Sequence, residues 1–374
     1  MKVTCLQENL ARGLSIVSRA VATRSTLPVL GNVYMATENG RLRLSATNLE
    51  LGITCWIGAK TEEDGSTTVP SRTFVDLINT LPNDQVEMDL SVRTQVLNVR
   101  SGPFTNDIKC IDAQEFPPML PPDLDGGIVI PAEDLKEMIS HVVFAASHDD
   151  ARPVLTGVLV TIDNGEMTMA AADGFRLSVR TAHLATPEAT LEKSIIPSRA
   201  MSELARILGD GDETVTMILP PDRGQVVFRT KSIEVVSQLI EGSYPDFQSI
   251  IPNSYETRAM VNTTAFLKAC KAADIFARES AHSARLRFVP GPGGTLEVSA
   301  TSAETGSNQT VVEATVEGEP VEIAFNVRFL VDVLNAVGTP NIYLETTSSS
   351  SPGLIRAAGR DDFLHVIMPM HLGK

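Results

Sequence analysis

Cysteine is scarce in this chain of 374 residues, and the four cysteines are widely spaced. Cys5, Cys55, Cys110 and Cys270 form no C-x-x-C pair and have no histidine pair beside them. A structural zinc site or a disulfide framework requires such clustering. We therefore expect buried or inert thiols in a reducing cytosol.

Long apolar runs are also missing. The apolar stretches are interrupted every few residues, whereas a membrane-spanning helix needs about 20 consecutive apolar residues. The first residues, Met1–Cys5, do not begin an apolar secretion signal. We expect a cytoplasmic protein without a membrane partner.

Recognisable enzyme motifs are absent as well. His148-Asp149-Asp150 is an isolated triplet, more typical of a loop than of a metal site or a general base. Gly209-Asp210-Gly211-Asp212 lacks the glutamate that completes a calcium loop. No glycine-rich phosphate loop or activated nucleophile is recognisable, and aromatic residues, which build sugar-binding platforms, make up only 5% of the chain. The sequence therefore predicts no catalytic residue, metal or cofactor.

Positive charge is in deficit, since the net charge is −15. Taken alone, this value argues against a nucleic-acid partner. The deficit is uneven, however, because the six expected helices carry 11 basic and 9 acidic residues. Their ranges are 8–24, 71–81, 132–148, 198–209, 263–279 and 326–337. Either the helices form a face that meets a polyanion, or lysine and arginine are simply good helix formers on solvated faces.

What the chain does contain is a long internal repeat. An apolar helix position, an expected helix N-cap and a hydrophobic-Pro step each occur three times, at separations of 124 to 132 residues. They are Leu10, Leu135 and Leu267; Ser71, Ser198 and Asn326; and Phe116-Pro117, Tyr244-Pro245 and Met368-Pro369. This period exceeds that of solenoids and matches a domain. We predict three similar domains, 1–124, 125–252 and 253–374.

Each repeat predicts the same α+β unit. In the first, Leu10, Leu14, Val17 and Val21 recur at helical spacing, and a second helix is expected over 71–81. About six to eight alternating runs read as antiparallel strands. Because each helix has one apolar stripe, both helices should pack on the same face of the sheet.

Several stretches resemble a known family when their order and spacing are considered together. They are Arg24-x-x-Leu27-Pro28-Val29-Leu30-Gly31-Asn32, Ala172–Leu177, Tyr244–Phe247, Phe325–Val327 and Val366–Leu372. The chain resembles the bacterial DNA polymerase III β subunit, the sliding clamp. The resemblance implies three clamp domains per chain, each with two helices on antiparallel sheets, in a head-to-tail dimeric ring whose helices line the hole. It implies a non-catalytic processivity factor that encircles double-stranded DNA.

The resemblance also implies partners and a partner pocket. The partners would be the polymerase III catalytic subunit, the clamp loader, and other polymerases, mismatch-repair and ligase-type proteins with clamp-binding peptides, in the nucleoid-associated cytoplasm. The positions that match the family's peptide pocket are Arg152, Leu155, Ala172, Gly174, Phe175, Arg176, Leu177, Pro245, Ser249, Ile250, Val366, Met368, Pro369, Met370 and Leu372. Some of the apolar ones could instead be core. Ala172, Ser249 and His371 depart from the familiar Thr, Arg and Arg, which affects the fine peptide preference.

Further positions are implied for DNA and for the dimer. The DNA-binding positions are Arg24, Arg72, His148 and Arg199, and helix phase adds Arg12, Arg19, Lys268, Lys271 and Arg278. The dimer-interface positions are Ile108, Ile275 and Phe276, with Asn106 replacing an expected aromatic residue. The alternative function is a three-domain interaction scaffold with no role on DNA.

Overall fold

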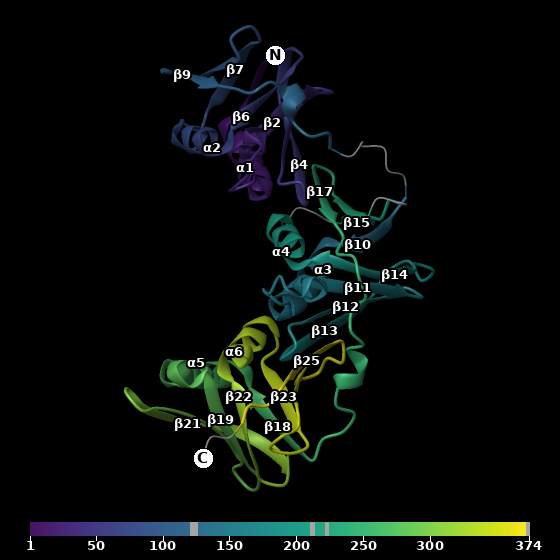
Figure 1. Cartoon of the computed structure of the whole chain (residues 1–374), viewed down its shortest axis with the longest axis vertical. Coiled ribbons are helices and arrows are strands. Elements are labelled where there is room, and N and C mark those ends of the chain that lie inside the picture. The colour runs from purple at the N-terminus through teal and green to yellow at the C-terminus, as the bar shows by residue number, and fades with distance from the viewer. Residues whose placement is uncertain (120–125, 210–213, 221–223, 372–374) are drawn as a thin grey trace. The chain divides into compact units, whose positions relative to one another are not determined.

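The computed structural model describes residues 1–119, 126–209, 214–220 and 224–371, and the chain divides into two compact units. Unit 1 comprises residues 1–133 and 206–239, and unit 2 comprises residues 134–205 and 240–374. Both units are built from antiparallel sheets covered by helices (Figure 1). In the part of the chain that the structure describes, no helix is long and apolar enough to cross a membrane.

Unit 1 contains two sheets. One has the strand order β5-β1-β7-β8-β9, and the other has the order β10-β15-β16-β17-β4-β3-β2-β6. Their elements are β1 (Lys2–Leu6), α1 (Gln7–Val17), β2 (Asn32–Glu38), β3 (Arg41–Thr47), β4 (Leu51–Gly58), β5 (Lys60–Glu63), β6 (Ser66–Pro70), α2 (Ser71–Thr80), β7 (Gln85–Ser91), β8 (Val96–Ser101), β9 (Phe104–Lys109), β10 (Ile128–Pro131), β15 (Thr214–Ile218), β16 (Gln225–Arg229) and β17 (Ile233–Gln238).

Unit 2 contains one sheet of twelve strands in the order β14-β11-β12-β13-β25-β24-β23-β18-β21-β20-β19-β22. Its elements are α3 (Ala132–Val142) and α4 (Ser198–Ile207), which lie mostly in this unit, with β11 (Gly157–Asp163), β12 (Glu166–Ala172), β13 (Arg176–His183), β14 (Leu191–Pro197), β18 (Thr257–Asn262), α5 (Thr263–Ala277), β19 (Ser283–Val289), β20 (Thr295–Ser302), β21 (Gly306–Gly318), β22 (Val321–Asn326), α6 (Val327–Ala336), β23 (Asn341–Thr346), β24 (Gly353–Ala357) and β25 (Phe363–Ile367).

The element order repeats three times along the chain. Each copy runs strand, helix, four strands, helix and three strands, with β4 continuing into β5 after one residue in the first copy. Neighbouring copies are joined within the sheets, because β17 of the second copy pairs with β4 of the first, and β25 of the third pairs with β13 of the second. The predicted boundaries at 124 and 252 remain predictions.

The first helix buries most of the stripe that the sequence predicts, but Val21 lies beyond it, half-buried in extended backbone, so the expected range 8–24 was too long. Leu10, Leu14 and Val17 of α1 are fully buried, and α1 contacts β4. The α-helix ends at Val17 and a 3-10 turn continues to Ala20. Gly13 permits close packing, since a Cβ there would lie 2.8 Å from the Cδ1 atom of Leu44.

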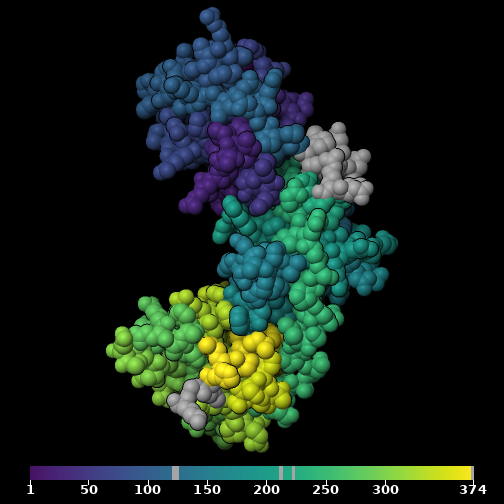
Figure 2. Space-filling view, viewed as in Figure 1, coloured from purple at the N-terminus to yellow at the C-terminus, as the bar shows by residue number. Residues whose placement is uncertain are grey.

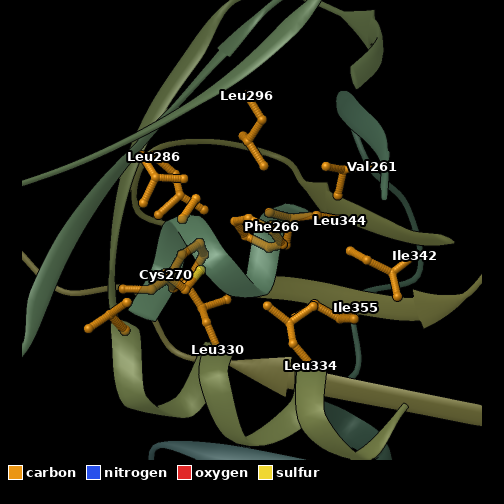
Figure 3. Close-up of a cluster of buried hydrophobic side chains, with 14 of the residues drawn as sticks. Val261, Phe266, Cys270, Leu286, Leu296, Leu330, Leu334, Ile342, Leu344 and Ile355 are labelled. Carbon is orange, nitrogen blue, oxygen red and sulfur yellow. The ribbon is translucent and has the colours of Figure 1, made fainter. Parts of the chain in front are cut away.

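The core of the third repeat shows both helices on one face of the sheet. Figure 3 shows Phe266 and Cys270 of α5 with Leu330 and Leu334 of α6, gathered among strand residues such as Leu286. All of these side chains are at most 3% exposed. The prediction that both helices share a face is therefore confirmed here.

Helix capping differs between the repeats. The side chain of Asn326 accepts a hydrogen bond from the backbone N–H of Arg328 over 3.0 Å, as an N-cap should. Ser71 is instead the first residue of α2, Pro70 is its N-cap, and no side chain caps that helix. Ser198 likewise begins α4 itself. The expectation that Ser71 is an N-cap was therefore wrong, because α2 begins one residue earlier than predicted and places Pro70, which has no capping side chain, at the N-cap.

Candidate functional site

A groove of about 1030 Å³ lies on unit 2, between the turn after β12, the chain after β25 and the third repeat. Its walls include Phe175, the segment Met368–His371, and Asn326 and Phe329 at the start of α6. Figure 2 shows the C-terminal residues, in yellow, at the surface of this unit beside the green third repeat. Large apolar side chains exposed together on a surface are typical of a binding site.

The turn between β12 and β13 presents Phe175 to this groove. Asp173 Oδ1 accepts hydrogen bonds from the backbone N–H groups of Phe175 (2.8 Å) and Arg176 (3.0 Å). Gly174 has φ +94°, and a Cβ there would lie 2.9 Å from Nη1 of Arg152. Glycine is required at such a position. The turn leaves the side chain of Phe175 60% exposed.

The C-terminal segment lines the groove next to Phe175. The N–H of Met368 donates to the carbonyl of Phe175 over 2.9 Å, and that of Met370 donates to Ala324 over 2.7 Å. The segment therefore links the second repeat to the edge of β22 in the third. Met368 is 41% exposed, and methionine adapts well to varied apolar ligands.

Several predicted pocket residues lie beneath the surface rather than on it. Leu155, Ala172, Leu177 and Val366 are buried in one apolar cluster with Tyr244. These four residues therefore belong to the core rather than to the surface of the groove. They support the turn and β25 but do not line the groove.

The remaining predicted positions do not line this groove, although Arg152 lies beside the turn at Gly174. Pro245, Ser249 and Ile250 are exposed in the segment before the third repeat and lie outside this groove. Arg152 pairs with Asp149, with Nε 3.2 Å from Oδ2. Leu372 lies outside the described residues. Their role in peptide binding remains a prediction.

Arg176 is buried rather than exposed to the groove. Its Nε donates to Asp173 (3.0 Å), Nη1 to Asp332 (2.6 Å) and Nη2 to the carbonyl of Phe144 (2.7 Å). Its guanidinium carbon lies 4.3 Å from the ring centroid of Phe329. Asn326 and Phe329 were missed as lining residues, although the Phe325-Asn326-Val327 stretch marked the start of their helix.

The first repeat contains the same turn with different side chains. Asn48 Oδ1 accepts from the N–H groups of Glu50 (3.1 Å) and Leu51 (2.8 Å), and Leu49 has φ +78°. Gln238, the last residue of β17, donates its N–H to the carbonyl of Glu50 over 2.9 Å. These backbone bonds match those of Asp173, Phe175 and Met368.

The groove beside this first turn is smaller and more polar. It measures about 540 Å³, and its walls include Glu50 and Gln238 where the second turn has Phe175 and Met368. The side chain of Met119 lies against Gly52. The same backbone turn therefore occurs in both repeats, and the aromatic ring of Phe175 distinguishes the groove of the second from that of the first.

The four predicted DNA-binding residues are all exposed. Arg24 and Arg72 belong to unit 1, and His148 and Arg199 belong to unit 2. Arg72 and Arg199 are each the second residue of a helix, α2 and α4. The residues added from helix phase, Arg12, Arg19, Lys268, Lys271 and Arg278, are exposed too.

The predicted dimer residues lie on different kinds of surface. Ile108 is only 8% exposed on β9, an edge strand of its sheet. Ile275 on α5 is 56% exposed, whereas Phe276 packs partly against the third-repeat core. Residues 306–313 of β21 pair with β20 alone among the described strands. Two partly unpaired strand edges therefore accompany these side chains.

Comparisons with known proteins cover nearly the whole chain. Three family models match, described as the N-terminal, central and C-terminal domains of the DNA polymerase III beta subunit, over residues 1–121, 129–246 and 248–371. The beta sliding clamp of Synechococcus elongatus is 33% identical over 376 residues, and that of Bacillus subtilis is 30% identical over 380. These alignments cover 100% and 99% of both chains respectively.

Solved structures agree with this result. The crystal structure of the DNA polymerase sliding clamp from Bacillus subtilis matches with a TM-score of 0.93 at 29% identity. The DNA polymerase III subunit beta from Pseudomonas aeruginosa matches with a TM-score of 0.91 at 28% identity. Each match covers 100% of both chains. The chain therefore consists of three clamp domains and belongs to the DNA polymerase III beta subunit family, the bacterial sliding clamps.

Proposed function

We propose that this sliding clamp encircles duplex DNA as a closed head-to-tail dimer and tethers its partners through the groove beside Phe175. The observation that carries the tethering proposal is the contact between Met368 and Phe175, which assembles an exposed apolar surface between two repeats. The family is non-catalytic and acts as the processivity factor of the polymerase. The clamp itself makes and breaks no covalent bond.

Repeated domains can form a ring if the rotation that relates one subunit to the next closes on itself. A head-to-tail interface joins two different surfaces, and rotation must return to the start for a ring to form. Two chains of three clamp domains would provide six similar units. The edges of β9 and β21, with Ile108, Ile275 and Phe276, are the surfaces that we assign to this interface. Exposed strand edges readily pair with another chain.

Retention on DNA would then be topological. Arg24, Arg72, His148 and Arg199 would provide a modest, sequence-independent attraction for phosphates. Tight phosphate contacts would slow sliding, so a weakly basic lining suits the function. The acidic excess outside the expected helices, 20 basic against 37 acidic residues, would repel DNA from the outer surface.

The groove would bind short extended peptides with leucine and phenylalanine anchors. Such peptides would be carried by the polymerase III catalytic subunit, the clamp loader, other polymerases, and mismatch-repair and ligase-type proteins. We place these encounters in the cytoplasm, at the nucleoid. An interaction scaffold without a DNA role is the alternative, and no observation on the site favours it.

The deciding experiment loads the protein with a matching clamp loader onto nicked circular DNA, which is then linearised. A topological clamp slides off the free ends but stays on the intact circle. Loss from linear DNA, measured by gel filtration of labelled protein, is the expected result. Retention after linearisation, or failure to load, would refute the ring.

A further inference from the structure

We propose that Asp332 is a positioning residue for the groove: by pairing with Arg176, it holds the ring of Phe329 in place as one wall. This inference rests on the proposed peptide-docking function of the groove. Asp332 does not line the groove itself and would act through its two neighbours.

The first step is the immobilisation of Arg176. Its side chain is 8% exposed, and all three guanidinium nitrogens have acceptors, from Asp173, Asp332 and the carbonyl of Phe144. Nη1 of Arg176, on β13 of the second repeat, donates to Asp332, on α6 of the third, over 2.6 Å. A planar guanidinium with three fixed donors cannot rotate away from its position.

The second step is the contact between Arg176 and Phe329. The guanidinium carbon lies 4.3 Å from the ring centroid, so one side of the ring is covered by the cation. Phe329 also lines the groove. Asp332 follows Phe329 by three residues on α6, which places both on one face of the helix. The ion pair therefore anchors the turn of helix that carries the groove wall.

The third step is that the fold itself does not need a charge at this position. In the equivalent turn of the first repeat, Leu51 stands where Arg176 stands in the second. Leu51 is 3% exposed, and the backbone bonds of the turn are the same. Apolar residues often replace a buried ion pair without loss of stability. A charged pair is kept where the groove is aromatic and is missing where the groove is polar.

The test compares peptide affinity with fold stability in the full-length protein. The probe is a short fluorescein-labelled peptide with leucine and phenylalanine anchors, and the dissociation constant is measured by fluorescence anisotropy. We expect Asp332→Asn to raise this constant about tenfold with little change in the thermal midpoint. Arg176→Leu, which copies Leu51, should fold and should also bind about tenfold more weakly. The matched control is Arg328→Gln on the same helix, whose arginine is 57% exposed and lies 3.7 Å from Asp274; its affinity should stay within about twofold.

A double mutant separates positioning from general structural damage. If Asp332 acts through Phe329, then adding Asp332→Asn to Phe329→Leu should weaken binding no further. The proposal would be overturned if the double mutant lost affinity by the product of the two single-mutant factors. It would also be overturned if Asp332→Asn bound the peptide as tightly as the wild-type protein, whatever its stability. Failure of the wild-type protein to bind the peptide would overturn the docking function as well, and is distinct from those outcomes.

Discussion

Arg360 donates a hydrogen bond from Nη1 to Oε1 of Glu137 over 2.7 Å, although 223 positions separate the two residues. The contact joins α3 of the second repeat to the loop before β25 of the third. Arg180 and Asp362 complete the group, with Arg180 Nη2 3.2 Å from Glu137 Oε2 and Nη1 2.5 Å from Asp362 Oδ2. Two positive and two negative charges thus balance where β13 meets β25, at the end away from the groove.

Replacing Glu137 by Gln should destabilise unit 2. The bonds from Arg360 and Arg180 hold the pKa of the Glu137 carboxyl down, to about 2, and removing the charge would leave Arg180, 6% exposed, underpaired. Breaking a fully buried pair costs about 3–5 kcal/mol. Because Glu137 is 39% exposed, we expect Glu137→Gln to lower the free energy of unfolding by only about 1–2 kcal/mol, as measured by chemical denaturation.

The control for this change is Glu62→Gln, which breaks a surface pair. Lys2 Nζ lies 2.7 Å from Glu62, and both side chains are about half exposed. Exposed pairs of this kind contribute little to stability. An equal effect of the two substitutions would contradict the special role of the Glu137 group.

Acid sensitivity should depend on His365. Burial, with the nearby charge of Arg176, lowers the pKa of this imidazole to about 3, whereas the unfolded chain titrates near 6.5. Because the unfolded state binds the proton first, stability is complete above pH 6.5 and falls as the pH drops toward 3. The slope is about 1.4 kcal/mol per pH unit.

The measurement is urea unfolding of the wild-type protein and His365→Gln between pH 7 and pH 4. Glutamine can still bond to Ser178, which lies 2.6 Å from Nδ1 of His365, but it does not titrate. The variant should lose less stability over this range. If the unfolding free energies of the two proteins fell in parallel with pH, His365 would not be the source of the acid sensitivity.

Replacing Met368 and Met370 by Ser should weaken binding of polymerase or of the labelled peptide at least about tenfold, because the groove wall beside Phe175 loses its apolar side chains. The backbone bonds of these residues do not involve their side chains, so the dimer should persist. Surface plasmon resonance measures partner binding, and light scattering measures the mass of the dimer. Val92→Ser, which replaces an apolar residue 65% exposed on unit 1, should leave binding unchanged.

Phe175→Glu should abolish docking without unfolding the protein. Glutamate already occupies the equivalent turn as Glu50, with the same backbone bonds. The change removes an aromatic anchor and adds a charge beside the groove, so we expect a loss of at least about twentyfold. Retained binding with intact circular dichroism would show that Phe175 does not contact the peptide.

Ile275→Asp should weaken the dimer. Ile275 is 56% exposed on α5, and a charge placed in an apolar interface opposes association. Light scattering should give about twice the 40.2 kDa chain mass for the wild-type protein, and a lower mass for the variant at micromolar concentration. Ile250→Asp, at a residue 45% exposed, is the matched control and should remain dimeric.

Much of the fold could be predicted from the sequence. The apolar stripe of α1 appears as Leu10, Leu14 and Val17 in the sequence because helical periodicity is local. The Asn326 cap was predicted from its residue type and its position in the repeat, and its hydrogen bond to Arg328 is equally local. The prediction for Ser71 was wrong, since a capping residue type does not fix the residue at which the helix begins.

For the site, sequence comparison found Phe175 and the Met368–Met370 segment but could not separate groove from core. Leu155 and Val366 have the same apolar character as Met368, yet they lie beneath the surface. Whether a side chain is buried depends on which distant segments pack over it, and the local sequence does not show this.

The sequence by itself determined the threefold repeat, the helix faces and the family, because these depend on spacing along one chain. Only the tertiary structure decided that Arg176 faces inward to meet Asp332, 156 positions later. It alone showed that the same turn is built twice, around Phe175 and around Glu50. Both features depend on packing between repeats. Contacts between residues far apart in the sequence determine which of several similar side chains are buried and which are exposed.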